Sequence, residues 1–171
     1  MNDTVLRLKS VRRAMRPFVL FLYEIVREIR PSFVLEIGVR NGQSTKTILS
    51  ALAENRRGRL VSIDVKRRLE EMSEGLRAHW ELVVGNSHEK ETYNKVSGRE
   101  YPILLIDGDH TYEGVKKDFE MYGKLVKKGG LILMHDILIP HYGVKDFWKE
   151  IKYPKIELNY GVAGMGIVQK I

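Results

Sequence analysis

The chain has 171 residues and a formal net charge of +7, from 29 Lys and Arg against 22 Asp and Glu. This length predicts one domain, and the 43% hydrophobic and 30% charged shares are ordinary for a soluble globular protein. The absence of cysteine excludes disulfides, thiolate zinc sites, thiol nucleophiles and cysteine-held iron–sulfur clusters. The apolar stretch Phe18–Ile29 contains three charged residues and is too short to span a membrane, so we expect a cytoplasmic protein.

The positive charge is concentrated in two stretches. Residues 1–30 hold seven basic residues against three acidic ones, and residues 56–68 hold six against one. Concentrated basic surfaces attract nucleic acid or anionic substrates, but a solvated helix face and a basic turn have the same composition. Both interpretations stay open at this point.

Ahead of residue 33 we expect a helical arm over residues 1–30. One helix is predicted at Val5–Met15, and Pro17 suits the first turn of a second helix. The apolar positions of the second helix predict one buried stripe, formed by Phe18, Leu22, Ile25 and Ile29.

From residue 33 onward, short β-branched apolar runs alternate with helical patterns. The predicted strands are Phe33–Ile37, Leu60–Ile63, Leu82–Val84, Ile103–Ile106 and Leu131–Met134. Each run is too short for a helix and too continuous for a strand with one solvated face, which indicates burial on both faces. The clearest helical patterns between them are Ser44–Asn55 and Tyr112–Lys127. This alternation predicts parallel βαβ units.

The C-terminal part differs from this alternation. After Asp136 we expect a short helix around Val144–Ile151 and two extended runs, Lys155–Tyr160 and Gly166–Lys170, that pair as an antiparallel hairpin. The sequence therefore predicts an α/β, Rossmann-like, doubly wound and mostly parallel seven-stranded sheet over residues 31–171. It would have helices on both faces and a C-terminal antiparallel hairpin.

In such sheets ligands bind beyond the carboxyl ends of the strands. The first predicted strand ends at Ile37, and its loop reads E-x-G-x-x-x-G from Glu36 to Gly42 before a helix opens. Glycines there allow a tight turn and a close approach to a ligand. Arg40 stands where a pyrophosphate-binding G-x-G-x-x-G loop has its middle glycine, which disfavours a dinucleotide site.

The next two strand ends also carry polar residues. Asp64 follows 22 residues after Gly42, where an acid can accept both hydroxyls of a ribose or cap a helix. Asn86 and Ser87 follow the third strand and can contact an adenine or cap the next helix.

The densest polar cluster follows the fourth strand, from Asp107 to His110. Two carboxylates and an imidazole can bind a cation or supply a general base. Alternatively, Asp109 or Thr111 caps the next helix and His110 is a packed turn residue. Asp107 ends a fully apolar run and is the least easily explained by capping.

The fifth strand ends at His135 and Asp136. Because adjacent strand residues point to opposite faces, we expect one of the pair at the site and choose Asp136. His141 and Tyr142 follow in a loop within reach of the same mouth.

Five segments together resemble the class I S-adenosylmethionine-dependent methyltransferases, closest to the small-molecule O-methyltransferase branch of cephalosporin-biosynthesis and macrolide-sugar enzymes. In order they are VLEIGVRNGQST, VSIDV, VVGNS, LLIDGDHTYEGVKKDFE and KKGGLILMHDI. The resemblance covers roughly residues 17–170, and its specific part is DGDHTYEGVKKDFE with GGLILMHD.

The resemblance implies S-adenosylmethionine as cofactor and assigns residues by position. Glu36, Gly38 and Gly42 would surround its methionine portion, Asp64 its ribose, and Asn86 or Ser87 its adenine. Ser44 and Asp107 complete the implied cofactor-binding set.

The resemblance also implies a divalent cation, Mg²⁺ or Mn²⁺, held by Asp107, His135 and Asp136. Metal-dependent relatives have an acid where this chain has His135. Because imidazole is a softer ligand than carboxylate, this set suits manganese or zinc better than magnesium.

Methyl transfer from a sulfonium is an in-line displacement, and a hydroxyl acceptor must lose its proton as it attacks. We predict His110 as the base, with Asp107 and Asp136 as ligands or orienting groups. The expected acceptor is a small-molecule or sugar hydroxyl. The absence of an N-P-P-[YF] signature counts against amino groups of DNA.

Two alternatives remain. An NAD(P)-dependent oxidoreductase fits the fold and Asp64 but lacks the pyrophosphate loop. A nucleic-acid-binding or RNA-methylating protein would use residues 1–16 and 56–68, although the chain offers no aromatic platform for stacking bases.

Two expectations concern partners. The basic arm lies where relatives shape the acceptor site, so we expect an anionic acceptor. An open mouth also invites completion by a second copy of the chain, which predicts a homodimer.

Overall fold

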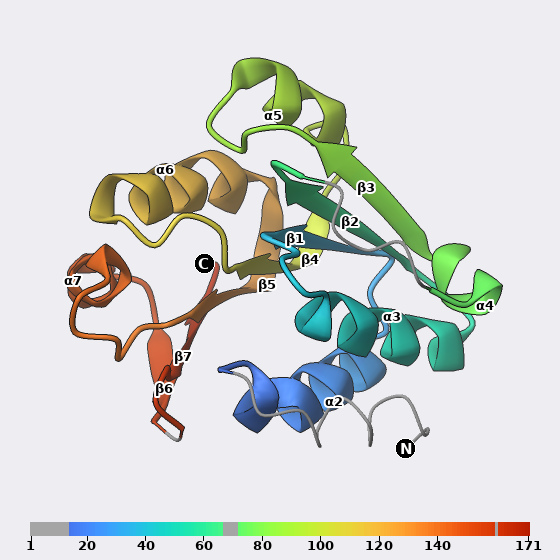
Figure 1. Cartoon of the computed structure of the whole chain (residues 1–171), viewed down its shortest axis with the longest axis horizontal. Coiled ribbons are helices and arrows are strands. Elements are labelled where there is room, and N and C mark those ends of the chain that lie inside the picture. The colour runs from blue at the N-terminus through green and yellow to red at the C-terminus, as the bar shows by residue number, and fades with distance from the viewer. Residues whose placement is uncertain (1–13, 67–71, 160) are drawn as a thin grey trace.

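A computed structural model of the chain describes residues 14–66, 72–159 and 161–171 (Figure 1). The helix expected at Val5–Met15 lies almost entirely outside these residues, as do Arg67 and Arg68 of the second basic stretch. No helix in the described ranges has the length and apolar character needed to cross a membrane.

The sheet has seven strands in the order β3-β2-β1-β4-β5-β7-β6. Strands β1 to β5 pair in parallel, and β7 pairs antiparallel with both β5 and β6. The strands are β1 (Phe33–Ile37), β2 (Arg59–Asp64), β3 (Trp80–Val84), β4 (Tyr101–Ile106), β5 (Val126–His135), β6 (Lys155–Leu158) and β7 (Met165–Gln169). The predicted doubly wound sheet with a C-terminal antiparallel hairpin is confirmed.

Helices cover both faces of this sheet, as Figure 1 shows. They are α2 (Val19–Ile29), α3 (Gln43–Asn55), α4 (Glu74–Arg77), α5 (Lys90–Val96), α6 (Tyr112–Tyr122) and α7 (Gly143–Glu150), with 3₁₀ turns at Arg16–Phe18 and Gly123–Leu125. Consecutive strand residues enter opposite cores, since Val34 packs with α2 and α3 while Leu35 packs with α6 and α7. This explains why apolar residues occupy consecutive positions in the parallel strands.

The helix predicted at Tyr112–Lys127 is too long. Helix α6 ends at Tyr122, a 3₁₀ turn follows, and Val126 begins β5, where it pairs with Tyr101. Val126 is buried as its apolar character demands, but in a strand. Pairing with β4 outweighs the helical spacing in this segment.

The buried stripe predicted for the second helix is also partly wrong. The chain enters α2 through the 3₁₀ turn Arg16–Phe18, and the helix then buries Val19, Leu22, Tyr23 and Val26. Ile29 is 38% exposed. Leu22 is common to both sets, and Ile25 is partly buried against the same core, so the buried face of α2 lies beside the predicted stripe rather than on it.

Strand order reverses between β1 and β4, and the two strand ends touch there. Gly38 has a φ of 91°, and a Cβ added to it would lie 2.1 Å from the carbonyl oxygen of Asp107. Only glycine tolerates this backbone conformation and this approach. The fold therefore brings the loops after β1 and β4 together at the expected ligand position.

Candidate active site

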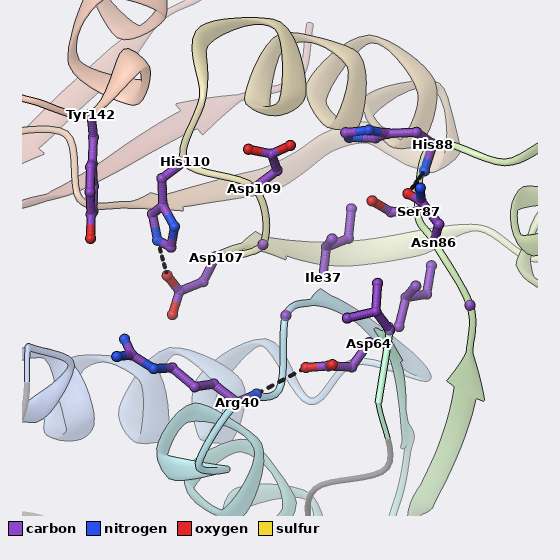
Figure 2. Close-up of a pocket in the computed structure, with 15 residues that line it drawn as sticks. Ile37, Arg40, Asp64, Asn86, Ser87, His88, Asp107, Asp109, His110 and Tyr142 are labelled. Atoms are coloured by element: carbon purple, nitrogen blue, oxygen red, sulfur yellow. Dashed lines mark hydrogen bonds and ion pairs between the residues drawn. The ribbon is translucent and has the colours of Figure 1, made fainter.

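A cavity of about 520 Å³ lies at the carboxyl ends of β1 to β4 (Figure 2). Its volume is typical of small-molecule sites. Gly38, Asp64, Asn86, Ser87 and Asp107 of the predicted cofactor set line it.

Asp64 both lines this cavity and holds the loop after β1. Its Oδ2 accepts hydrogen bonds from the backbone N–H groups of Val39 at 2.9 Å and Arg40 at 3.0 Å. Its Oδ1 accepts one from the N–H of Lys66 at 2.9 Å. The carboxylate therefore sets the shape of the cavity wall as well as contributing to it.

Glu36 lies beneath the site rather than at its surface. Hydroxyls of Ser44, Thr45 and Ser62 donate to its carboxyl group at 2.6, 2.8 and 2.6 Å, and the side chain is fully buried. Burial raises the Glu36 pKa to about 7, although the three hydroxyls favour the ionised form.

Of the residues expected around the methionine portion, neither Glu36 nor Gly42 lines a cavity. Gly42 has a φ of 70° at the start of α3. Glu36 and Gly42 therefore support the loop without lining the cavity. Gly38 lines this cavity, and Ser44 lines a second, smaller cavity described below.

The far end of the cavity carries Asn86, Ser87 and His88. The Oδ1 of Asn86 accepts a hydrogen bond from the N–H of His88 at 2.9 Å. His88 Nε2 lies 3.3 Å from Oδ1 of Asp118, a fully buried acid on α6 whose pKa burial raises to about 6. This pair was not predicted from the sequence. The sequence pattern that could have revealed it is Asp118 three residues after Val115, which places an acid on the buried face of α6.

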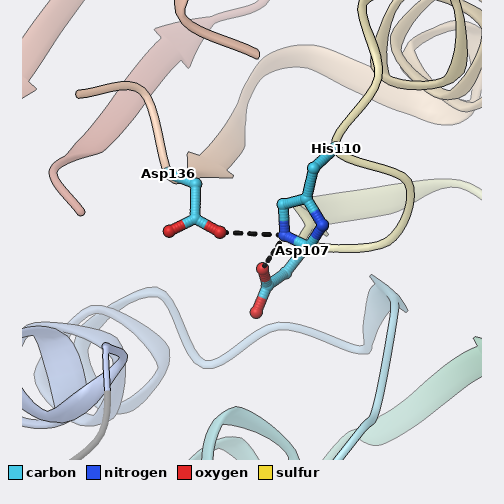
Figure 3. Close-up of side chains that lie close together, drawn as sticks. All are labelled: Asp107, His110 and Asp136. Carbon is cyan, nitrogen blue, oxygen red and sulfur yellow. Dashed lines mark ion pairs between the residues drawn. The ribbon is translucent and has the colours of Figure 1, made fainter. Parts of the chain in front are cut away.

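A second group of charges gathers at the ends of β4 and β5 (Figure 3). His110 Nε2 lies 2.8 Å from Asp136 Oδ2 and 3.5 Å from Asp107 Oδ1. His135 Nδ1 lies 3.1 Å from Asp136 Oδ1 and 3.3 Å from Asp107 Oδ1. Two carboxylates thus alternate with two imidazoles, and we call these four residues the charge cluster.

Both members of the β5 pair belong to the charge cluster, against the expectation that only one would. Strand β5 ends at His135, and Asp136 has a φ of 64°, outside the extended range. The alternation of side chains holds only within a strand, so it does not apply to Asp136.

The cluster shifts the pKa of each member. Hydrogen bonds to Asp107 and Asp136 raise the His110 pKa to about 9. Burial opposes protonation of His135, but the same two carboxylates outweigh it and raise its pKa to about 10. Burial likewise opposes ionisation of Asp107 and Asp136, yet the imidazoles hold both carboxyl pKa values below the usual range. Without a bound cation the cluster therefore favours ionised carboxylates and protonated imidazoles, and a cation at His110 would displace the proton from the coordinating nitrogen.

The donor set of the cluster fits a divalent cation. Ligand atoms of Asp107, His110 and Asp136 lie within 4.8 Å of one another. Two carboxylate oxygens and one imidazole nitrogen suit manganese or zinc better than magnesium. The set differs from the predicted one, because His110 takes the place of His135, whose ring is 3% exposed and packs edge-on against Phe18.

The capping alternatives near His110 are partly realised. The hydroxyl of Thr111 accepts a hydrogen bond from the N–H of Gly114 as the N-cap of α6, and Asp109 accepts one from the N–H of Thr111. His110 stacks against Tyr142, with ring centroids 4.5 Å apart. Asp107 contacts His110 and His135 in the charge cluster, in agreement with the expectation that it is not a helix cap.

A second cavity, of about 240 Å³, adjoins the first at Arg40 and Asp107, which line both. Met15, Ser44, His135 and Asp136 also contribute to it. Tyr142 lines the first cavity, whereas His141 lines neither.

A doubly wound sheet of this strand order, with a cavity and charged residues at the switch point, defines the Rossmann-like fold of class I methyltransferases. Residues 35–137, more than half of the chain, match the family described as a methyltransferase domain. The chain belongs to this family, and the resemblance found in the sequence is confirmed. This assignment favours methyl transfer over the NAD(P)-dependent alternative.

Solved structures with this fold include several O-methyltransferases. A candidate caffeoyl-CoA O-methyltransferase from Staphylococcus aureus is 20% identical, with a TM-score of 0.74 over 99% of this chain and 93% of that one. MycE of the mycinamycin biosynthetic pathway, in complex with Mg, SAH and mycinamycin VI, is 17% identical, with a TM-score of 0.73 over 99% and 55%. TomG from Streptomyces achromogenes, in complex with SAM, is 18% identical, with a TM-score of 0.70 over 99% and 91%. At these identities the comparisons establish the fold alone.

One curated protein is similar in a short segment. An uncharacterized protein of Acanthamoeba polyphaga mimivirus is 56% identical over 34 residues, which are 20% of this chain and 15% of the viral protein. The match spans too little of that protein to extend to activity.

Proposed function

We propose that the chain transfers a methyl group from S-adenosylmethionine to a hydroxyl of a small molecule or sugar. The observation that carries this proposal is the position of the charge cluster, at the junction of two cavities beside the strand switch point. The methyltransferase family match and the cofactor complexes of MycE and TomG support it.

The larger cavity is proposed to hold the nucleoside. Asp64 would accept the ribose hydroxyls, and Asn86 and Ser87 would face the adenine from the far end. Gly38 has no side chain, and it lies against the backbone of Asp107, which lines both cavities. A ligand that extends from one cavity into the other would therefore meet no side chain at position 38. Ser44 lies in the second cavity, on the methionine side of this crossing.

His110 is proposed to accept the proton that the acceptor hydroxyl releases as its oxygen attacks the methyl carbon. Asp136 orients the imidazole at 2.8 Å, and Tyr142 packs on its ring. Because the His110 pKa is about 9, only the minor neutral form at pH 7 can take this proton. When bound, S-adenosylmethionine supplies an electrophilic methyl group on a sulfonium, and a divalent cation supplies a Lewis acid that lowers the hydroxyl pKa. Asp107, His110 and Asp136 would hold that cation, and since a coordinated imidazole nitrogen cannot also accept a proton, His110 would act as the base only in the absence of a cation.

The proposal is tested first by ligand binding. S-adenosylhomocysteine should raise the melting temperature of the protein, and NAD should not. Stabilisation by NAD alone would overturn the proposal. Release of S-adenosylhomocysteine during incubation with S-adenosylmethionine, Mn²⁺ and a panel of hydroxyl acceptors then tests the methyl-transfer step. The same panel with amino-group acceptors distinguishes O-methylation from N-methylation.

A homodimer is a further proposal about the assembled protein, and it rests on the open mouth of the site. Sedimentation equilibrium with and without S-adenosylhomocysteine tests it, and a monomer under both conditions would exclude it.

A further inference from the structure

Among the described residues that line the two cavities, Arg40 is the sole arginine or lysine. It lines both cavities, together with Asp107. Figure 2 shows its side chain running from the backbone beside Asp64 toward the Asp107 end of the site, with the guanidinium on the same side as His110 and Tyr142.

The backbone of Arg40 is held in a conformation that non-glycine residues seldom adopt. Its φ is 47°, and its N–H donates to Asp64 Oδ2 at 3.0 Å. A left-handed conformation costs free energy for a side chain with a Cβ, so glycine would be the more stable choice here. The arginine is therefore a candidate for function rather than for loop stability.

The guanidinium has no acidic partner in the described part of the chain. No carboxylate there lies within 4.0 Å of it, although Asp107 lines the same cavities. Asp107 and Asp136 are instead engaged by His110 and His135. A planar fork of hydrogen-bond donors is thus exposed at the entrance to the site.

The other described basic residues do not serve this site. Arg27 donates to the side chain of Asn55 and lies 3.6 Å from Glu54, and Arg30 donates to the backbone carbonyl of Asn55. The basic stretch 56–68 is divided by β2, which places Arg56, Arg57 and Arg59 at the opposite strand end from Asp64. None of these residues lines either cavity.

The charge of Arg40 would be a disadvantage with a neutral acceptor. The proposed methyl donor is a sulfonium cation and the charge cluster is suited to a second cation, so a guanidinium beside them repels both. An acceptor that carries a carboxylate or phosphate removes this repulsion, because the guanidinium fork matches the oxygens of either group.

We propose that Arg40 binds an anionic group, carboxylate or phosphate, on the methyl acceptor and presents its hydroxyl to His110. The inference rests on the proposed function, and it names the substrate class as hydroxylated acids and phosphorylated sugars. The sequence predicted an anionic acceptor from the basic N-terminal arm; in this proposal the anionic group is bound by Arg40 instead.

Binding of matched acceptors to protein saturated with S-adenosylhomocysteine tests this inference by calorimetry. The pairs are 3,4-dihydroxybenzoate with catechol, and glucose 6-phosphate with glucose. The anionic member of at least one pair should bind about tenfold more tightly, the size expected for one charge-assisted hydrogen-bonded contact. The first pair reports a carboxylate site, and the second a phosphate site.

The variants are Arg40→Gln, Arg40→Lys and the matched control Arg57→Gln. Arg57 is exposed in the turn before β2 and lines neither cavity. Arg40→Gln should abolish the preference for the anionic member, Arg40→Lys should keep part of it, and Arg57→Gln should keep all of it. Arg40→Gln and Arg40→Lys keep the backbone N–H that donates to Asp64, and Arg57 lines neither cavity, so the affinity for S-adenosylhomocysteine should stay within about twofold in all three variants.

Three outcomes would overturn the inference. Equal binding of both members of each pair to the wild-type protein would do so, as would an undiminished preference in Arg40→Gln. A tenfold loss of S-adenosylhomocysteine affinity in Arg40→Gln would assign the guanidinium to the methionine carboxylate instead. Failure of the wild-type protein to bind S-adenosylhomocysteine would reject the proposed function itself, and the two failures are thereby distinguished.

Discussion

The backbone N–H of Arg40 donates a hydrogen bond to Asp64 Oδ2 at 3.0 Å, which joins the loop after β1 to the acid at the end of β2. The same oxygen accepts the N–H of Val39 at 2.9 Å. The acid proposed to bind the ribose therefore also fixes the loop along which the cofactor would lie. Loop geometry and the proposed ribose recognition would then depend on one carboxylate.

Replacement of Asp64 should reduce both stability and cofactor affinity. Hydrogen bonds to a charged acceptor contribute about 1.5–3 kcal/mol, so Asp64→Ala should weaken S-adenosylhomocysteine binding by at least about tenfold. Asp64→Asn keeps one acceptor oxygen and should lie between Asp64→Ala and wild type. Calorimetric titration and thermal unfolding measure the two effects. Asp146→Asn, at an exposed acid paired with Lys149 on α7, is the control and should alter neither. A lower melting temperature with unchanged affinity would limit Asp64 to a structural role.

Gly38 should not tolerate a methyl group. In Gly38→Ala the new Cβ would lie 2.1 Å from the carbonyl oxygen of Asp107, at a φ of 91°. The backbone strain alone costs about 1–3 kcal/mol, so the melting temperature should fall by several degrees and S-adenosylhomocysteine binding should weaken. Gly98→Ala is the control, because nothing lies within 4 Å of its added Cβ. Equal melting temperatures for the two variants would show that the loops separate without cost.

The residues at the strand ends could be predicted because sheet topology alone brings them together. Asp64 and Asp107 each follow a buried apolar run, and parallel strands end at one edge of the sheet. The consecutive apolar residues Phe33 to Leu35 of β1 likewise indicated a strand covered by helices on both faces, which the separate cores around Val34 and Leu35 confirm.

What could not be predicted depends on single backbone angles and on long-range pairing. The φ of 64° at Asp136 turns its carboxylate to the same side as the His135 ring, so that the two side chains lie 3.1 Å apart. The alternation of side chains along a strand does not predict such a turn. The end of α6 at Tyr122 is set by pairing of Val126 with Tyr101, which local spacing cannot reveal. The buried contact of Asp118 with His88 joins segments 30 residues apart and has no local motif.

His110 should affect turnover and not cofactor binding. Positioned proton transfer typically contributes about 10²–10⁴-fold to a rate, so His110→Ala and His110→Gln should lose turnover in that range. Their affinity for S-adenosylhomocysteine should match that of the wild-type protein. His141→Gln is the control, since this side chain lies in the same loop as Tyr142 but lines neither cavity. Weakened cofactor binding with normal turnover would reject the assignment of His110 as base.

The charge cluster should bind Mn²⁺ more tightly than Mg²⁺. Calorimetric titration of the protein with each ion measures this preference, which follows from one imidazole and two carboxylates as ligands. Asp136→Asn should reduce Mn²⁺ affinity by at least about tenfold, because it removes a charged ligand. Asp109→Asn removes an acid two residues from Asp107 that is outside the cluster, and should leave affinity unchanged. Equal losses in both variants would indicate general electrostatic attraction rather than a site.

The pH dependence of stability should report the buried carboxyl group of Glu36. Burial raises its pKa from 4.5 in the unfolded chain to about 7 in the folded protein. A raised pKa means that the folded protein binds the proton more tightly, so this contribution is complete below about pH 4.5 and is lost as pH rises through 7. The difference in pKa corresponds to about 3 kcal/mol of unfolding free energy.

Urea unfolding of wild type and Glu36→Gln at pH 5 and pH 8 measures this contribution. Glutamine keeps the shape but does not titrate, and its single amide oxygen can accept either from Ser44 or from Thr45 and Ser62, while its NH2 group donates on the other side. The free energy of unfolding that the wild-type protein loses between the two pH values should therefore shrink in Glu36→Gln. Comparing each protein with itself cancels any pH-independent effect of the substitution, and comparing the two pH-dependent changes cancels the contributions of other titrating groups. Glu91→Gln, at an exposed acid paired with Lys95, should follow the wild-type profile. If Glu36→Gln also follows it, Glu36 is already ionised within the fold, and the three hydroxyls outweigh the effect of burial.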